Sequence, residues 1–381
     1  MKCEILTLIS PMKSLYKDIQ KSILFHFNYI PEGHEYKRLM ILIGMIYSTI
    51  AGENCSLESQ GLNFPEEGDL KREKESRLKQ AKRWLMSKWT DYTAHYQPFI
   101  VGFIEKVAKQ KKELIFVIDG SETGANCVTL MISLVWGKRS IPIIWLSRQG
   151  KKGHFPEQMH IDLLSALSNI LKEIGIKERV IILGDGEFDG KAWVAFIELQ
   201  KWDYVLRTSL DRKVSHMGDT FPISQVPIDP YLECGFVLFG VNNSHAILWK
   251  GRNYKDPIPL ITNMEVVKMA CKYYKKRFAI ETLFKDFKSN GFNIHKVKIS
   301  DPYRIHNLLI VVSLAFLFAF AIGKAAKKYG QNLAQVYRID RINKLSDFKF
   351  GLKLLLFCLK NRTCISHFFT KSFDFFFNLQ I

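Results

Sequence analysis

The sequence predicts an α/β fold in which a mixed β-sheet follows a helical N-terminal region. Two observations carry this prediction. Apolar, β-rich runs alternate with amphipathic helical stretches from residue 114 onward, and two of these runs end in an aspartate. With 47% hydrophobic and 13% aromatic residues, the 381-residue chain can form a large core. We expect two domains, or one domain with an insertion.

Residues 1–108 are expected to be helical. An apolar periodic stretch, Tyr36–Ile50, ends at Gly52, and a basic amphipathic stretch, Ser76–Ser87, has Ser76 as its expected N-cap. Around the polar connection 53–75, the two helices are compatible with a helix-turn-helix-like DNA reader. A solvated basic helix in an ordinary bundle fits this segment equally well.

Residues 109–345 carry the predicted sheet. Three strands are followed by a helix, a strand, a helix and a strand, which makes a sheet of mixed strand direction. This order resembles the ribonuclease H-like fold. The expected strands are 114–119, 127–136, 141–146, 180–185 and 204–207, and the helices are 160–174 and 191–200.

A β-rich insertion is expected at about 208–263, because short β-like pieces and turn residues replace any long helical period there. The pieces are 235–241, 245–249 and 259–262. Residues 346–381 are expected to form a helical tail, and its Phe-rich part, 368–377, has no clear interpretation.

The uncharged run Leu308–Ile322 is expected to be a core helix buried on all sides. It is shorter than the roughly 18–20 residues that a bilayer requires. A membrane anchor is the alternative, and we expect no membrane partner.

The charge balance indicates a polyanionic partner. Lys and Arg number 55 against 37 Asp and Glu, a net charge of +18, which favours phosphate neutralisation and counterion release. A basic protein without such a partner is the alternative. The seven cysteines form no CxxC pair, so we expect free thiols in a reducing cytoplasm.

Asp119 and Asp185 each end a predicted buried strand, at the sheet edge where open α/β sheets bind ligands. A carboxylate there needs a partner, and a divalent metal is a good one. With Glu281, three acids could converge on two metals about 3.5–4 Å apart, as phosphodiester chemistry requires. Taken singly, each aspartate could instead be a turn residue or an N-cap.

Tyr274, Arg277, Glu281 and Lys288 are separated by 3, 4 and 7 residues. On a single helix these spacings place all four side chains on one face. A carboxylate beside an arginine, a lysine and a phenol can bind a divalent metal and hold a phosphate next to it. An amphipathic helix with surface salt bridges is the alternative.

These motifs resemble those of DDE-type transposases of bacterial insertion sequences, in the family named insertion sequence four. Its Tyr-(2)-Arg-(3)-Glu-(6)-Lys pattern is matched by Tyr274, Arg277, Glu281 and Lys288 without a gap. Its usual Asp-Arg-Glu-x-Asp segment is here 185–189, Asp-Gly-Glu-Phe-Asp, so the arginine is missing. The resemblance covers roughly residues 36–345.

The resemblance implies that Asp119, Asp185 and Glu281 bind metal, with two Mg²⁺ ions expected and Mn²⁺ able to substitute. It implies that Arg277 and Lys288 hold phosphates of the element's end and that Tyr274 contacts the DNA backbone. Stacking on a flipped base is assigned to Trp249 and Phe278, with core packing as the alternative.

Arg207, at a strand end, is a further candidate phosphate contact. Recognition of the element's end is assigned to four basic residues of the second N-terminal helix, with a solvated face as the alternative: Arg77, Lys79, Lys82 and Arg83.

The sequence therefore predicts a metal-dependent DNA transposase that cleaves the element's inverted ends and transfers the strands to target DNA. The resemblance implies a homodimer on double-stranded DNA, and we expect a bacterial, cytoplasmic, nucleoid-associated location. The alternatives are an inactive, transposase-derived DNA-binding regulator and a ribonuclease H-like nuclease without strand transfer.

Overall fold

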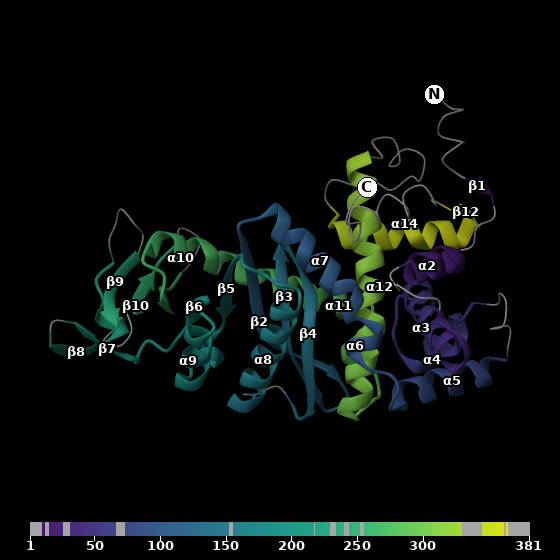
Figure 1. Ribbon diagram of the computed structural model, residues 1–381, viewed down its shortest axis with the longest axis horizontal. Helices are drawn as coiled ribbons and strands as arrows, with labels where there is room; N and C mark the ends of the chain where they lie inside the picture. Colours follow the sequence, from purple (N-terminus) through teal and green to yellow (C-terminus); the bar gives the residue numbers. More distant parts are fainter. Residues whose placement is uncertain are drawn as a thin grey trace.

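The structure is a computed structural model of the chain (Figure 1). It describes residues 10–11, 15–25, 31–65, 73–151, 155–216, 218–228, 234–239, 244–251, 255–329, 345–361 and 363–364. The Phe-rich segment 368–377 lies outside the described residues.

An eight-stranded mixed sheet forms the centre of the molecule. Five of its strands give the predicted order: β2, β3 and β4 are antiparallel neighbours, and β5 and then β6 continue on the other side of β2, parallel to it. This arrangement is consistent with a ribonuclease H-like fold. The strands are β2 (Glu113–Gly124), β3 (Cys127–Trp136), β4 (Arg139–Gln149), β5 (Arg179–Gly184) and β6 (Asp203–Arg207).

Three strands of the predicted β-rich segment join the central sheet, and two others form a separate two-stranded sheet. Strands β11 (Ile258–Thr262), β10 (Ser244–Trp249) and β9 (Cys234–Phe239) extend the central sheet from β6, each antiparallel to its neighbour. A hairpin of β7 (Lys213–His216) and β8 (Asp219–Pro222) precedes them. Figure 1 shows these elements at the left end of the molecule.

Helices connect and cover the sheet. Between β4 and β5 runs α8 (Glu157–Glu173), which packs on β3 and β4, and between β5 and β6 runs α9 (Lys191–Leu199). After β11 follow α10 (Val267–Tyr274) and α11 (Phe278–Phe287), and α11 packs against β2 and β4.

The N-terminal region is helical, as predicted, but its details differ. It contains α2 (Leu15–Leu24), α3 (Gly33–Ala51), α4 (Leu57–Asn63), α5 (Lys74–Met86), α6 (Tyr92–His95) and α7 (Gln97–Gln110). The polar connection 53–75 contains a further helix, α4, capped by Ser56, which accepts from the Ser59 N–H. Helix α5 begins two residues before Ser76, with Glu73 at its N-cap, so the predicted Ser76 cap is wrong.

The apolar helix α12 (Pro302–Tyr329) stands between the sheet and the N-terminal helices in Figure 1. Its length and composition would suffice to cross a membrane, but 94% of its most apolar window is buried inside the protein. The expectation of a buried core helix is therefore confirmed. The argument that the run is too short to cross a bilayer was wrong, because the helix extends well beyond the uncharged run.

Helix α14 (Asp347–Asn361) crosses α12 at close range. A Cβ at Gly323 would collide with the Asp347 carbonyl, and one at Gly351 with that of Ala319, so two glycines allow the backbones to meet. Helix α12 also packs against α3 and α5, and one buried apolar cluster runs from the N-terminal helices through the sheet to α14. Two short strands, β1 (Ser10–Pro11) and β12 (Thr363–Cys364), pair beside these helices.

Candidate active site

Strand register places the two predicted aspartates in one row. Val117 of β2 pairs with Leu183 of β5 in parallel, so Asp119 and Asp185 lie at the same level two residues further on. Strand β6 continues the row, because Gly184 pairs with Leu206 and the next residue is Arg207. In parallel strands, residues at the same level point to the same side of the sheet.

Asp119 does not end its strand, contrary to the prediction. Strand β2 continues to Gly124 in antiparallel pairing with β3, and what ends at Val117 is its pairing with β5. The gap that opens beyond Val117 gives the Asp119 side chain access to the cavity. Asp185 follows β5 directly and caps a short 3-10 turn, 186–188, so the predicted strand end is confirmed there.

The helix that was predicted to carry Tyr274 to Lys288 is interrupted by a 3-10 turn, although the backbone keeps right-handed helical dihedrals from Tyr274 to Phe278. Helix α10 ends at Tyr274, a 3-10 turn covers Lys275–Arg277, and α11 ends before Lys288. The four residues do not lie on one regular α-helix as predicted, but Arg277, Glu281 and Lys288 line one cavity and the Tyr274 ring lies against Arg277. The turn aims Arg277 and Glu281 at the aspartate row, and Lys288 reaches the cavity from beyond the end of α11.

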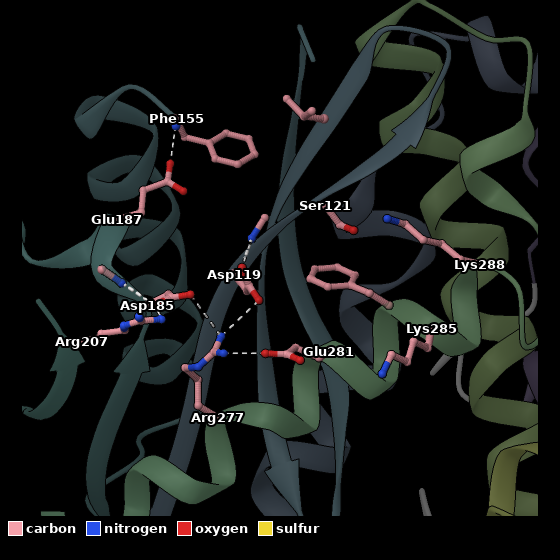
Figure 2. Close-up of a pocket in the computed structure, with 14 residues that line it drawn as sticks. Asp119, Ser121, Phe155, Asp185, Glu187, Arg207, Arg277, Glu281, Lys285 and Lys288 are labelled. Atoms are coloured by element: carbon pink, nitrogen blue, oxygen red, sulfur yellow. Dashed lines mark hydrogen bonds and ion pairs between the residues drawn. The ribbon is translucent and has the colours of Figure 1, made fainter. Parts of the chain in front are cut away.

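Arg277 joins the three predicted acids (Figure 2). Its Nη2 donates to Glu281 Oε1 at 2.5 Å, and its Nη1 lies 3.4 Å from Asp119 Oδ2 and 3.8 Å from Asp185 Oδ2. The guanidinium side chain is 6% exposed, against 23% for Asp119, 36% for Asp185 and 40% for Glu281. A buried cation thus lies within ion-pair distance of three partly exposed carboxylates, which come from β2, from the turn after β5 and from α11.

These side chains open into a cavity of about 820 Å³. Acids and cations share its wall with two phenylalanines, as Figure 2 shows. The lining residues are Asp119, Gly120, Ser121, Val128, Phe155, Asp185, Gly186, Glu187, Arg207, Arg277, Glu281, Phe284, Lys285 and Lys288. A Cβ at Gly120 would collide with the Phe155 ring, so this glycine lets the ring close one side of the cavity.

Burial raises the pKa of Asp119 to about 6, against the opposing effect of Arg277 and of the Gly120 N–H, which donates to Oδ1 at 2.8 Å. The neighbouring Asp185 and Glu281 charges raise it further. The Nε of Arg277 has no hydrogen-bond partner among the described residues. The site therefore concentrates negative charge that one guanidinium only partly offsets.

Sequence reasoning missed Glu187 and Lys285. Glu187 lines the cavity and accepts from the Phe155 N–H. Its signal was its position two residues after Asp185 in the same acidic segment. Lys285 lies one helical turn after Glu281, and that i,i+4 spacing could have placed it on the same face. The third acid of the segment, Asp189, is not in the cavity lining: it accepts from Thr208 and from Arg212 Nη1, the latter at 2.7 Å.

Two aromatic side chains predicted to contact DNA are buried. Tyr274 is 1% exposed and Trp249 is 2% exposed, and their rings meet edge to face with centroids 6.4 Å apart. The Arg277 guanidinium lies 5.9 Å from the Tyr274 ring. These facts argue against both predicted DNA contacts. Trp249 packs in the core, which was the alternative, and Tyr274 lies behind Arg277, where it positions the guanidinium.

Phe278 and Arg207 are accessible. Phe278 is 37% exposed, with the Arg277 guanidinium 4.9 Å from its ring. The Arg207 side chain is 51% exposed, and its Nη1 lies 3.6 Å from Asp185 Oδ1. Arg207 lines the cavity, whereas Phe278 is accessible beside Arg277 but is not among the lining residues.

The four basic residues predicted on the N-terminal helix do not share one environment. Lys79, Lys82 and Arg83 are exposed on α5, but Arg77 is 8% exposed and its Nη1 donates to the Phe64 carbonyl at 3.3 Å. Burial argues against a DNA contact by Arg77.

The described residues contain no ready-made cluster of three or more metal-ligating side chains. The guanidinium of Arg277 stands between the acids instead. The donor set still fits a hard divalent cation: three carboxylates from β2, β5 and α11 face one cavity, and oxygen ligands with room for water suit Mg²⁺. An ion there would replace a cation that these carboxylates already share.

Carboxylates from a mixed sheet and a later helix, with basic side chains around them, are typical of enzymes that transfer phosphoryl groups. A family model described as "Transposase DDE domain" matches residues 89–318, more than half of the chain. The protein therefore belongs to the transposase DDE domain family. Membership implies a DNA substrate and phosphoryl-transfer nuclease chemistry, for which enzymes of this family generally use divalent metals.

Among solved structures, the chain is similar to Marinitoga piezophila Argonaute in complex with 5′ OH guide RNA and target DNA, at 16% identity and a TM-score of 0.24, over 66% of this chain and 37% of that one. The same Argonaute in complex with 5′ OH guide RNA gives 15% identity and a TM-score of 0.23, over the same shares. These similarities are too weak to carry an argument. The comparison with curated proteins gives no match.

Proposed function

We propose that this protein is a DNA transposase that binds the terminal inverted repeats of its element, cleaves them and transfers the freed 3′ ends to target DNA. The observation that supports this most is the convergence of Asp119, Asp185 and Glu281 on the Arg277 guanidinium at the cavity. We also place the protein in the insertion sequence four family, because Tyr274, Arg277, Glu281 and Lys288 match its pattern.

Asp119, Asp185 and Glu281 would hold Mg²⁺, with Mn²⁺ as a substitute. When bound, two such ions activate a water or 3′-hydroxyl nucleophile and stabilise the leaving oxygen. The chain supplies the rest. Arg277, released from the carboxylates, would hold the scissile phosphate, and Lys288 and Arg207, which line the same cavity, would bind flanking phosphates. Phe278, which is exposed beside Arg277, would offer a ring to an unpaired base.

Cleavage of a labelled duplex that carries the element's terminal repeat tests this function. The wild-type protein should nick the repeat end only with Mg²⁺ or Mn²⁺. Asp119→Ala, Asp185→Ala and Glu281→Ala should each lose nicking yet retain end binding. Asp219→Ala removes an exposed carboxylate on β8, outside the cavity lining, and should cleave normally. Full activity in any of the three cavity variants would contradict the assignment.

A joining assay separates transposition from the alternatives. A donor end with a 3′-hydroxyl should join to a target duplex, and a 3′-deoxy end should not. Nicking without joining indicates a nuclease, and end binding without nicking indicates a DNA-binding regulator. Lys288→Ala should weaken end binding and reduce its dependence on salt.

We also propose that two copies assemble across paired ends, in the cytoplasm at the nucleoid. The size of the complex on one-end and two-end DNA, measured by sedimentation, checks the stoichiometry.

A further inference from the structure

The turn between α5 and α6 presents the most exposed tryptophan of the protein. All seven tryptophans lie in the described residues. Five of them are at most 9% exposed and Trp136 is partly buried, but Trp89 is 62% exposed. Met86, which ends α5 three residues before Trp89, is 63% exposed. Tryptophan is enriched at binding interfaces, so an exposed indole near an exposed methionine is a candidate binding surface.

The backbone under Trp89 is held firmly. Thr90 Oγ1 donates to the Trp84 carbonyl at 2.8 Å, and the Trp89 N–H donates to Ser87 Oγ at 3.2 Å. From α12, the Tyr303 hydroxyl donates to the Ser87 carbonyl at 2.8 Å. The ring is therefore exposed on a fixed turn, which lowers the entropy that a ligand must overcome.

Basic residues lie near the ring in space or in sequence. Lys88 Nζ lies 5.2 Å from its centroid, and Lys82 and Arg83 are exposed on the preceding helix. Ser87 and Arg83 also line a second cavity of about 660 Å³ between α3 and α5, together with Lys37 and Arg38. The cavity reaches the turn at Ser87, two residues before Trp89, so its basic side chains and the exposed indole fit a phosphate backbone and a base attached to it.

The same charge disfavours a second copy of this chain as the occupant. The protein carries a net charge of +18, so two copies that met through this surface would bring like charges together. A strand of nucleic acid offers the complementary charge and flat rings that stack on an indole.

The turn is also connected to the catalytic sheet. The Ala125 N–H, at the β2–β3 turn, donates to the carbonyls of Val297 and Ile299, just before the α12 end that carries Tyr303. Asp119 lies on the same strand, β2, five residues before Gly124. At the usual rise of a strand, the distance along β2 from Asp119 to Gly124 is about 17 Å. Trp89 thus has a defined position relative to the candidate active site.

We infer that Trp89 is a stacking platform for an unpaired base of the DNA, with the phosphates of that strand bound by Arg83, Lys37 and Arg38. This inference rests on the proposed DNA-binding function. It names a contact outside the acidic cavity, and it concerns unpaired DNA rather than the duplex repeat.

Binding of fluorescein-labelled DNA to the full-length protein in EDTA tests the inference, since cleavage is then suppressed. One probe is a blunt duplex and the other is the same duplex with a short single-stranded overhang. Trp89→Ala should weaken binding of the overhang probe about ten-fold, as expected for the loss of one stacked base, and affect the blunt probe much less. Trp89→Phe, which retains a ring, should restore most of the affinity.

Leu62→Ala is the matched control, because Leu62 on α4 is 60% exposed in the same helical region, and it should bind both probes normally. The overhang probe should also quench tryptophan emission in the wild type and not in Trp89→Phe. Wild-type affinity of Trp89→Ala for the overhang probe would overturn the inference. So would equal losses on both probes, or a change in the sedimentation of the DNA-free protein, which would mark an interface between copies.

The two proposals fail separately. If Glu281→Ala abolishes cleavage and Trp89→Ala binds the overhang normally, only the stacking platform is wrong. If the wild-type protein does not cleave the repeat, but Trp89→Ala alone loses affinity for the overhang probe, the stacking platform stands and the transposase function does not. A wild-type protein that binds neither probe overturns both.

Discussion

The candidate active site and the N-terminal helical surface use their cations in opposite ways. In the cavity, Arg277 is nearly inaccessible and is bound to three carboxylates. On α5, Lys79, Lys82 and Arg83 are exposed to solvent. The first region is organised around internal charge pairs before any ligand arrives, whereas the second presents charge to a partner. The difference suggests that the cavity governs chemistry and that the helical surface governs capture of DNA.

The largest expected effect comes from Arg277→Ala. It removes the cation that Asp119, Asp185 and Glu281 share and leaves their charges facing one another. In EDTA we expect the free energy of unfolding to fall by about 3 kcal/mol, the low end for a broken buried pair because the carboxylates are partly exposed. Mg²⁺ should then raise the melting temperature of this variant more than that of the wild type. Calorimetry across a Mg²⁺ series measures both effects.

Arg207→Ala is the control for that experiment. Its side chain is half exposed and 3.6 Å from Asp185, so its loss should change the unfolding free energy by less than about 1 kcal/mol. Equal metal stabilisation of Arg277→Ala and wild type would mean that the three carboxylates do not form a shared cation site.

The acidic row was predictable from sequence because it follows from strand register. Two apolar runs that end in Asp119 and Asp185 become parallel neighbours, and parallel pairing fixes their level. The 3-10 turn between α10 and α11 was not predictable. Lys275, Lys276 and Arg277 are compatible with a regular helix, and none of these residue types favours a 3-10 turn over an α-helical one.

The helical surface was less predictable for a physical reason. A basic amphipathic helix shows which residues are polar but not which of them face a neighbouring segment. Arg77 and Lys79 are two residues apart and point in different directions, so Arg77 reaches the Phe64 carbonyl and Lys79 reaches solvent. For the aromatic residues, Trp249 and Tyr274 followed the usual preference for burial, and sequence alone gave no signal that Trp89 would be exposed.

A second internal pair gives a pH test of the charge-paired region. Asp286 on α11 is 1% exposed at its side chain and accepts from Arg139 at 3.0 Å. Burial raises the pKa of Asp286 from 3.8 to about 6, although Arg139 acts to lower it. Since the folded state binds this proton more tightly than the unfolded state, its contribution to the free energy of unfolding is largest below pH 3.8 and is lost as the pH rises to about 6.

As the pH rises across that window, the free energy of unfolding of the wild type should therefore fall by roughly 2–3 kcal/mol relative to that of Asp286→Asn. Urea unfolding at several pH values measures this difference. Asp219→Asn is the control, because Asp219 is exposed. The difference in the free energy of unfolding between wild type and Asp219→Asn should not change over the same pH range. A difference that moves in favour of the wild type with rising pH would mean that the Arg139 ion pair outweighs burial.

Within the helical surface, Arg77 should behave like a residue of the interior. Arg77→Gln removes a buried donor to the Phe64 carbonyl, and we expect a loss of about 1–2 kcal/mol in the free energy of unfolding. At temperatures where the variant is folded, its affinity for duplex DNA should match the wild type. A clear loss of DNA affinity without loss of stability would restore the original assignment of Arg77 to the DNA contact.

The smallest effect on stability is expected from Lys82→Gln combined with Arg83→Gln. Both side chains are exposed, so the free energy of unfolding should change by less than about 0.5 kcal/mol. DNA binding should respond instead, because each lost phosphate contact lowers the slope of log affinity against log salt by about 1. We expect the double variant to lose about 2 from that slope and Arg77→Gln to lose nothing.

Fluorescence anisotropy of a duplex over a salt series gives both slopes, and equal slopes for wild type and double variant would show that this helix face does not bind DNA. Because Arg83 also lines the cavity beside the Trp89 turn, a slope loss confined to Arg83→Gln would place the phosphate contacts in that cavity and not along the open face of α5.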